Sequence, residues 1–372
     1  RLLRHIYTRI RQFIRPDELV SRHSSDNFDV LLRSSCTDRE MFLRIQDMTR
    51  AVERDLEKQL EMRVKNRYAL SLRCGVYRIT NPALPMVILR DRAILARKHP
   101  THTMEGRMGV CGFYSDVERS RLLYEKHLEN RMEAALKAEE FVVYFQPKVA
   151  LGGRRHIEGA EALVRWIDPM EGLVPPNKFI PFFERNGFIR QLDLYVFQQV
   201  CACIRRWMDQ GMRLVPISVN LSRIHLEDPD FLRSFVAVQK RFRIPTQLLE
   251  LELTETAVAD DLDAVVEAVE RIHAAGFRCS LDDFGSGYSS LNNLKELDVD
   301  TLKLDKAFCR SLEMDEPKER AIIASVVAMA RKLGMTTVAE GVETLRQCEF
   351  LQEVHCDMIQ GYLVSKPVPV ER

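Results

Sequence analysis

The feature that most constrains the fold is an alternation of short apolar strands and amphipathic helices from residue 141 onward. The pattern predicts strands at residues 141–149, 157–165, 216–220, 249–253, 277–282, 301–305, 336–340 and 357–362. Between most of them, apolar residues recur at helical spacing, for instance over 260–275 and 319–333. Eight strands alternating with helices in about 230 residues are typical of a (β/α)8 TIM-like barrel in the α/β class.

Polar residues stand within or at the end of seven of these strands. They are Glu161, Asn220, Glu252, Asp282, Lys303, Glu340 and Gln360. Barrel enzymes build their sites from the carboxyl ends of strands, so we expect these side chains to meet at one end of the barrel. A lone acid at a strand end is usually a cap or a surface ion pair, but seven polar residues on seven strands are difficult to explain in that way.

The stretch Leu281–Leu291, LDDFGSGYSSL, is the expected centre of the chemistry. Asp282 and Asp283 end an apolar run and precede a loop with Gly285 and Gly287, which permit the chain to turn. Adjacent carboxylates repel each other unless a proton or cation lies between them, and Mg²⁺ and Mn²⁺ prefer oxygen ligands. The pair therefore indicates a metal site; the alternative for an isolated pair is an ordinary solvated Asp-Asp turn.

The remaining strand-end acids extend this hypothesis to two cations. Buried together, Glu161, Glu252, Asp282, Asp283 and Glu340 would be unstable without cations, because unpaired buried charge is costly. Two divalent ions would balance most of that charge, and such a pair suits in-line displacement at phosphorus. On the barrel pattern alone, a metal-dependent enzyme acting on another phosphodiester or on a carbon acid remains an alternative.

Composition limits the function classes. The chain has 372 residues, roughly two domains' worth, and a net charge of +1 that provides no field to recruit nucleic acid or an acidic membrane surface. Nine cysteines without paired CxxC motifs suggest reduced core thiols in a cytoplasmic protein. The sequence contains no run of 18 apolar residues, so it predicts no membrane-spanning helix. With no initiator Met, the chain is interpreted as a fragment of a longer parent, which could itself be membrane-anchored.

The sequence predicts three parts. They are an incomplete α+β domain over residues 1–115, an amphipathic linker helix over 116–139 and the barrel domain over 140–372. The expected elements of the first part are helices at 1–14, 38–64 and 84–98 and strands at 28–32, 68–79 and 106–114. A domain that opens on a helix is expected to lack its front half.

The stretch Arg15–Phe28 resembles the central hairpin of a GGDEF, or diguanylate cyclase, domain, with SSDNF (Ser24–Phe28) in place of the five-letter motif. Serines replace glycines that let a nucleotide approach, and Asn27 replaces a metal-binding acid. Arg15 and Glu18 fall on the family's inhibitory Arg-x-x-Asp pattern, with Glu for Asp. The resemblance implies no cyclase activity. A GTP-binding or dimerising regulatory role and a plain structural spacer are the alternatives.

Eight motifs follow in the barrel part. They are YFQP (144–147), EALVR (161–165), SVNLS (218–222), ELTE (252–255), DDFGSGYSSL (282–291), KLD (303–305), AEGVE (339–343) and QGY (360–362). On these motifs, residues 141–370 resemble the EAL family of cyclic di-GMP phosphodiesterases. The resemblance implies a hydrolase of bacterial second-messenger signalling that converts cyclic di-GMP to linear pGpG with two divalent ions, Mg²⁺ or Mn²⁺. The alternative is a catalytically silent receptor for cyclic di-GMP.

The resemblance also implies roles for individual residues. The cation ligands would be Glu161, Asn220, Glu252, Asp282 and Asp283, with Asp282 bridging two ions. Lys303 would orient the attacking water, and Glu340 would act as general base or complete the metal shell, two roles between which the residues alone do not choose.

Further residues of the motifs would bind substrate or support the site. Gln146, Leu163 and Arg165 would contact substrate, and Gln360 would lie near the catalytic water. Glu255 and Glu343 would anchor the loop from Gly285 to Ser290, which couples metal binding to homodimerisation through the barrel.

Overall fold

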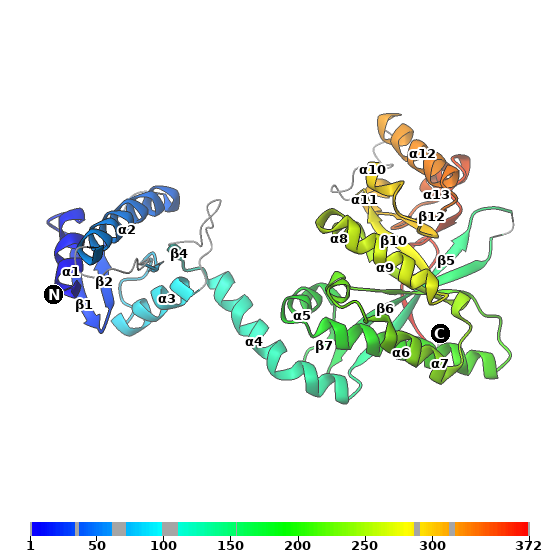
Figure 1. Cartoon of the computed structure of the whole chain (residues 1–372), viewed down its shortest axis with the longest axis horizontal. Coiled ribbons are helices and arrows are strands. Elements are labelled where there is room, and N and C mark those ends of the chain that lie inside the picture. The colour runs from blue at the N-terminus through cyan, green and yellow to red at the C-terminus, as the bar shows by residue number, and fades with distance from the viewer. Residues whose placement is uncertain are drawn as a thin grey trace. The chain divides into compact units, whose positions relative to one another are not determined.

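The computed structural model describes residues 2–33, 37–61, 72–98, 111–153, 155–285, 291–311 and 317–370. The chain divides into two compact units, Arg1–Glu129 and Asn130–Arg372, and helix α4 (Asp116–Lys137) contributes to both (Figure 1). Over these described ranges, no helix is long and apolar enough to cross a membrane.

The first unit has the predicted helices and strands in the predicted order, with one further strand, β1, before the strand predicted at 28–32. Its elements before α4 are α1 (Leu2–Phe13), β1 (Leu19–Ser24), β2 (Asn27–Leu31), α2 (Asp38–Glu61), β3 (Cys74–Val76), α3 (Met86–Lys98) and β4 (Cys111–Phe113). Strands β3 and β4 pair in parallel. The predicted strand over 68–79 is too long at its end, because the described residues 77–79 lie outside β3. The predicted residues 62–64, 68–71 and 106–110 lie outside the described ranges.

Strands β1 and β2 form the expected antiparallel hairpin, in which Ser24 pairs with Asn27. Ser25 in the turn has φ of +38°, in the left-handed region where glycine is favoured, and its carbonyl oxygen accepts a hydrogen bond of 2.9 Å from Nε of Arg22. The side-chain oxygen of Asn27 accepts a 2.7 Å bond from Arg97 in α3. Hydrogen bonds from Arg22 and Arg97 therefore hold the turn at a position where the backbone conformation favours glycine.

Glu18 fixes the start of this hairpin against α2. Its buried carboxylate accepts two bonds from the guanidinium of Arg44, of 2.8 and 2.6 Å, and further bonds from the backbone N–H groups of Arg15 and Arg33. The hydrogen bond from Arg44 lowers the pKa of Glu18 to about 2, against a smaller opposing effect of burial, and the two backbone donors help. Glu18 thus joins three segments of the unit.

The second unit is a closed barrel of eight strands, which confirms the predicted fold class. The strands are β5 (Phe141–Ala150), β6 (Ile157–Asp168), β8 (Ile217–Asn220), β9 (Leu249–Thr254), β10 (Arg278–Phe284), β11 (Thr301–Leu304), β12 (Thr336–Ala339) and β13 (Met358–Ile359). Their order is β5-β13-β12-β11-β10-β9-β8-β6, and pairing of β6 with β5 closes the ring. Short strands β7 (Gly172–Val174) and β14 (Val368–Pro369) pair with β6 and β5.

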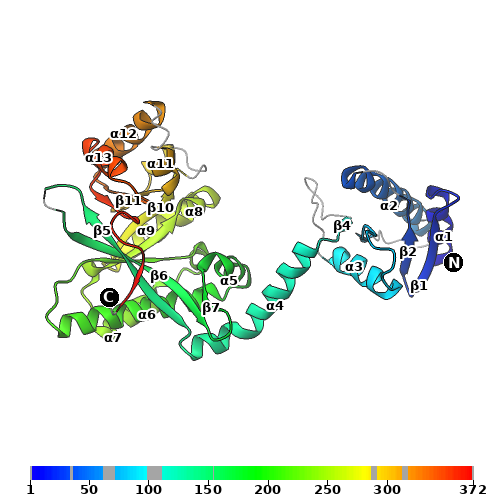
Figure 2. The same ribbon diagram turned by 180° about the vertical axis from the view of Figure 1, so that it is seen from behind.

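Helices lie outside this ring of strands (Figures 1 and 2). They are α5 (Ile180–Asn186), α6 (Ile189–Asp209), α7 (Leu232–Phe242), α8 (Glu255–Asp260), α9 (Leu262–Ala274), α10 (Leu291–Leu294), α11 (Lys306–Ser311), α12 (Pro317–Lys332) and α13 (Leu345–Glu353). Helix α9 illustrates why they form: Asp261 caps its first turn by accepting the N–H of Ala264, and Val265, Ala268 and Ile272 are buried on one face.

One strand departs from the (β/α)8 pattern. Strand β5 runs antiparallel to both of its barrel neighbours, β6 and β13, whereas the other barrel pairs are parallel. The six residues between β5 and β6, with Gly152 and Gly153, are too few for the helical crossover that parallel strands require. Strand β5 therefore enters the barrel in the opposite direction from all other strands of the ring.

Candidate metal centre

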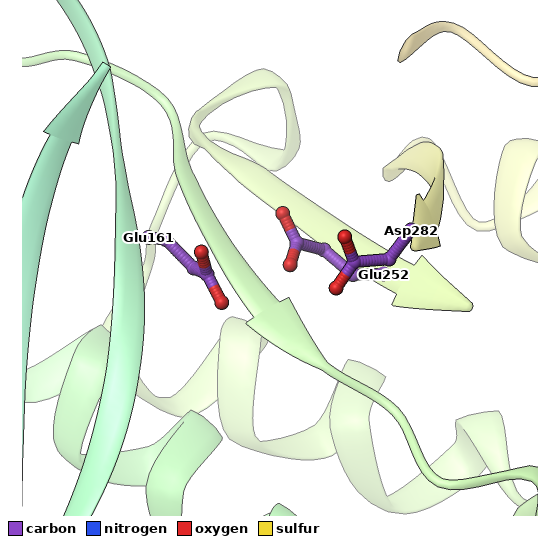
Figure 3. A group of neighbouring side chains, drawn as sticks. All are labelled: Glu161, Glu252 and Asp282. Carbon is purple, nitrogen blue, oxygen red and sulfur yellow. The ribbon is translucent and has the colours of Figure 1, made fainter. Parts of the chain in front are cut away.

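Three carboxylates from separate barrel strands meet in the interior of the barrel unit. Glu161 on β6, Glu252 on β9 and Asp282 on β10 are buried, and each offers an oxygen within 4.8 Å of the others. Figure 3 shows the three carboxylates turned toward the space between them. They come from positions 121 residues apart in sequence (161 to 282) and are brought together only by closure of the barrel.

A second group shares a member with the first. Asp282, Asp283 and Glu340 also offer oxygens within 4.8 Å of one another. The chain turns at Asp283 itself, which has φ of +57°, and the register of β10 with β11 shifts between Leu281 and Phe284. Successive carboxylates on a regular strand would point to opposite faces, so this bulge lets Asp282 and Asp283 join one cluster. Asp282 belongs to both groups.

The Lys303 ammonium lies at the centre of these acids. This fully buried lysine on β11 is within 4.0 Å of four carboxylates. The distances from its Nζ are 2.7 Å to Glu340, 2.8 Å to Glu252, 3.0 Å to Asp282 and 3.3 Å to Glu161. Among the described residues, it is therefore the hub of the cluster.

One ammonium group faces four acids here, and two of these acids, Asp282 and Glu340, have raised pKa values. Burial raises the pKa of Asp282 well above its usual range, Lys303 opposes this, and Glu340 adds to it. Burial likewise raises the pKa of Glu340 to about 7 against the opposing charge of Lys303. For Lys303 itself, burial favours the neutral amine, but the surrounding carboxylates outweigh it and raise its pKa. Burial therefore disfavours the charged forms of Asp282 and Glu340 more than Lys303 favours them.

Glu252 differs because a second lysine approaches it. The ammonium of Lys148 on β5 lies 3.0 Å from Oε1 of Glu252 and donates a 2.8 Å hydrogen bond to the Ser218 hydroxyl. Burial disfavours the charged form of Glu252, but the ammonium groups of Lys148 and Lys303 prevail and lower its pKa to about 2. Sequence reasoning missed Lys148. The available signal was a lysine two residues after Gln146, on the same face of an otherwise apolar strand.

Amide side chains orient Glu161. Asn220 at the end of β8 donates a 2.9 Å bond to its Oε1, and Gln360 after β13 donates a 2.6 Å bond to its Oε2. Gln360 also contacts Gln146 at 3.2 Å, and Gln146 donates to the carbonyl oxygen of Ser365. Four predicted site residues thus form one hydrogen-bonded chain around the first carboxylate group.

The predicted substrate residues on β6 lie beside this centre. Leu163 and Arg165 are partly buried, and the guanidinium of Arg165 lies 5.8 Å from the centroid of the Tyr144 ring. Its hydrogen bond goes to the carbonyl oxygen of Val164, at 2.7 Å. Burial lowers the pKa of Arg165 from its ordinary value, while Glu161 opposes this effect. Neither residue is part of the carboxylate cluster.

The two predicted loop anchors differ. Glu255 is buried at the start of α8 and accepts a 2.7 Å hydrogen bond from the backbone N–H of Gly285. Gly285 has φ of +94°, and a Cβ there would overlap the ring of Phe308. Glu343, in contrast, is exposed. Residues 286–290 of the loop lie outside the described ranges.

The donor set fits divalent cations that prefer oxygen. Carboxylate oxygens from five acids converge in two overlapping groups, and hard cations such as Mg²⁺ and Mn²⁺ bind such ligands. Burial, with a smaller contribution from neighbouring carboxylates, raises the pKa values of Asp282 and Glu340, and a bound cation would favour their charged forms. A shared carboxylate between two groups is suited to a pair of ions.

A family model named EAL domain matches residues 129–367. Curated relatives from Pseudomonas aeruginosa include the bifunctional diguanylate cyclase/cyclic di-GMP phosphodiesterase MucR, 32% identical across 100% of this chain, and the cyclic di-GMP phosphodiesterase NbdA, 32% identical across 99%. The matches cover 53% and 46% of those proteins, so the chain spans about half of their length.

Solved structures are also similar. The MucR phosphodiesterase in complex with c-di-GMP is 37% identical with a TM-score of 0.61, covering 66% of this chain and 98% of that one. The cGMP-bound EAL enzyme Bd1971 is 29% identical with a TM-score of 0.63, covering 68% of this chain and 70% of that one.

Proposed function

The chain belongs to the EAL domain family, and from that premise we propose that its barrel hydrolyses one phosphodiester bond of cyclic di-GMP to give linear pGpG. The observation that carries the proposal is the pair of overlapping carboxylate groups that share Asp282 and surround Lys303. Relatives whose names specify cyclic di-GMP phosphodiesterase activity, and a similar barrel solved with c-di-GMP, support the choice of substrate.

The proposed cofactors are two divalent ions, Mg²⁺ or Mn²⁺. Glu161, Asn220, Glu252 and Asp282 would hold one ion, and Asp282 and Asp283 the other. Bound there, the ions would supply positive charge to the phosphodiester and make water a better nucleophile.

Two residues at the centre would act on the attacking water. Lys303 lies within 2.7–3.3 Å of the surrounding acids, so its ammonium can donate to a water held among them and offset charge that develops on the phosphate. Glu340 has a carboxylate on the same lysine and would either accept the proton of that water or complete the cation shell. Both roles require Glu340 to remain a carboxylate beside Lys303.

Residues beside the centre would position the dinucleotide. The guanidinium of Arg165 would pair with a phosphate through two parallel N–H donors, and Leu163 would contact the same ligand. Gln146 and Gln360 would take part from the hydrogen-bonded chain around Glu161. Glu255, through Gly285, and Glu343 would anchor the loop that follows Asp283.

The test is incubation of the purified chain with cyclic di-GMP and Mg²⁺ or Mn²⁺, with EDTA as control, and product analysis by chromatography. We expect pGpG to form only with the cation, and Glu161→Ala to abolish turnover while binding of cyclic di-GMP persists. Binding without cleavage by the unmodified chain would identify the alternative, a silent receptor. Cleavage of a chromogenic phosphodiester but not of cyclic di-GMP would exclude the proposed substrate.

We further propose that the chain forms a homodimer through its barrel, that it acts in the cytoplasm, and that residues 1–115 form a degenerate GGDEF-like domain joined by a linker helix over 116–139. The alignment with MucR over the whole chain supports the last point. Light scattering of the purified chain tests dimerisation, and calorimetric titration with GTP tests the first unit. A monomer at working concentration would contradict the proposed assembly.

A further inference from the structure

A second buried lysine lies beneath the carboxylate cluster, and the proposed reaction assigns it no role. Lys148 on β5 is 2% exposed. Its ammonium lies 3.0 Å from Oε1 of Glu252 and donates a 2.8 Å bond to Oγ of Ser218. The Ser218 hydroxyl donates a 3.5 Å bond to the carbonyl oxygen of Ala160 and also helps to lower the pKa of Glu252, so Lys148, Ser218 and Glu252 lie together in the barrel interior.

The reversed direction of β5 explains how this lysine reaches Glu252. In the pairing of β5 with β6, Gln146 lies opposite Glu161, whereas Lys148 lies opposite Gly159, farther from the carboxyl end of β6. Lys148 therefore starts one layer deeper in the barrel than the carboxylate cluster. A Cβ at Gly159 would make only ordinary contact with the lysine stem, at 3.7 Å from Cδ, and would approach the carbonyl oxygen of Pro216 more closely, at 3.3 Å.

The two lysines engage opposite oxygens of Glu252. Lys148 contacts Oε1 from below, and Lys303 contacts Oε2 at 2.8 Å from the side of the cluster. Lys303 also contacts Glu161 and Asp282, the other members of the first carboxylate group. One oxygen of Glu252 thus has a partner outside the cluster, and the other contacts Lys303 inside it.

We propose that Lys148 is a positioning residue for the first cation: it holds Oε1 of Glu252 so that Glu252 binds the ion through Oε2 alone. The inference rests on the proposed cation site. Carboxylates can bind a cation with one oxygen or with both, so a fixed partner on Oε1 determines the number of ligands available. Hydrogen-bonding partners of metal ligands typically change metal affinity 10- to 100-fold.

Two effects of Lys148 oppose each other. Its charge repels a cation nearby, but its removal would leave the fully buried Glu252 with an oxygen that has lost its partner. That oxygen would turn toward Lys303 or toward the cation and distort the site. We expect the positioning effect to prevail, because Lys148 contacts Glu252 directly, whereas a bound cation would be held by the other oxygen of that carboxylate. Loss of Lys148 therefore weakens cation binding.

The experiment measures Mn²⁺ affinity of the full chain by electron paramagnetic resonance of the free ion, which does not require turnover. Lys148→Met keeps the length of the side chain and removes its charge. We expect about 10- to 100-fold weaker Mn²⁺ binding, and a matching increase in the Mn²⁺ concentration for half-maximal hydrolysis. The turnover rate at saturating Mn²⁺ should fall much less. Ser218→Ala, which keeps Lys148 but removes its other partner, should weaken binding by a smaller factor.

The matched control is Val149→Ala, a truncation of the buried neighbour on the opposite face of β5. It should lower the melting temperature and leave Mn²⁺ affinity unchanged. If the unmodified chain binds no Mn²⁺, the proposed cation site fails, and the role of Lys148 fails with it. If it binds, then unchanged or tighter binding by Lys148→Met overturns this inference alone, as does equal weakening by Val149→Ala. Should Lys148→Met not fold, unchanged binding by Ser218→Ala overturns it.

Discussion

The ammonium nitrogen of Lys303 lies 2.7 Å from Oε1 of Glu340. Lys303 is on β11 and Glu340 directly follows the neighbouring parallel strand β12, where its backbone N–H donates to the carbonyl oxygen of Leu304 on β11. The same ammonium also contacts Glu161, Glu252 and Asp282. Lys303 thus occupies the region in which cations and water are expected to bind, and it shares its partners with them.

Replacement of Lys303 separates catalysis from cation binding. We expect Lys303→Met to lower the rate of cyclic di-GMP hydrolysis by about 10²–10³-fold, the usual effect of removing a donor that stabilises developing charge. Mn²⁺ affinity should stay the same or increase, because the acids lose a competing positive charge. Rate measurements and Mn²⁺ titration of the same preparation check both points. Lys332→Met, at an exposed lysine of α12, is the control. A variant with full activity would exclude the proposed role.

The role of Glu340, as cation ligand or as general base, can be determined by a similar pair of measurements. Because Glu340 shares a carboxylate group with Asp282 and Asp283, we expect Glu340→Gln to remove the second cation, so that the number of bound Mn²⁺ ions falls from two to one. Hydrolysis should fall by about 10²–10⁴-fold in either role. Unchanged stoichiometry together with the loss of activity would instead identify Glu340 as the general base.

Gly285 is predicted to be required for the shape of the loop after the acids. An added Cβ there meets the Phe308 ring, and φ of +94° is unfavourable for any other residue. We expect Gly285→Ala to destabilise the barrel by about 1–3 kcal/mol and to lower activity, because the bond to Glu255 would be displaced. Gly172→Ala is the matched control, since Gly172 has φ of +73° but open space around its Cβ position. Equal effects of both variants would mean that the Phe308 contact is unimportant.

Much of the barrel could be predicted because its strands carry a local signal. Short apolar runs that end in a polar residue, such as the run before Asp282, marked both the strands and the end at which the site lies. The direction of β5 was missed, although the six residues between β5 and β6 were too few for a helical crossover. The later strands alternate regularly with helices, and this favoured the prediction of a (β/α)8 barrel in which all strands are parallel.

Pairwise contacts inside the barrel could not be predicted. Lys148 and Glu252 are 104 residues apart, and nothing local to either residue identifies the other. A lysine in an apolar strand can pair with many different acceptors, so its position in the sequence does not identify its partner. Likewise, the inhibitory-site resemblance at Arg15 and Glu18 did not foresee that Arg44 would take the Glu18 carboxylate, because their contact depends on the packing of α2.

The Glu18 contact predicts how the first unit responds to acid. Its pKa of about 2 in the folded chain lies below the ordinary value of 4.5, so the ion pair stabilises the unit above pH 4.5, and this contribution is lost as pH falls toward 2. The contribution amounts to at most about 3 kcal/mol. Hydrogen exchange of β1 and α2 at neutral pH should be faster in Glu18→Gln.

The control for Glu18 is Asp17→Asn, which removes an exposed ion pair with Arg33 and should change stability by less than about 1 kcal/mol. If Glu18→Gln exchanges no faster than this control, the buried carboxylate does not stabilise the unit as described.

Hydrolysis of cyclic di-GMP in water enriched in ¹⁸O tests the central claim most directly. We predict that, with Mg²⁺ or Mn²⁺ present, mass spectrometry finds pGpG with one heavy oxygen in its terminal phosphate, and that chelation of the cation stops its formation. Cyclic di-GMP that remains intact under these conditions, or product formed equally well after the cation is removed, would contradict the account of the barrel as a cation-dependent phosphodiesterase.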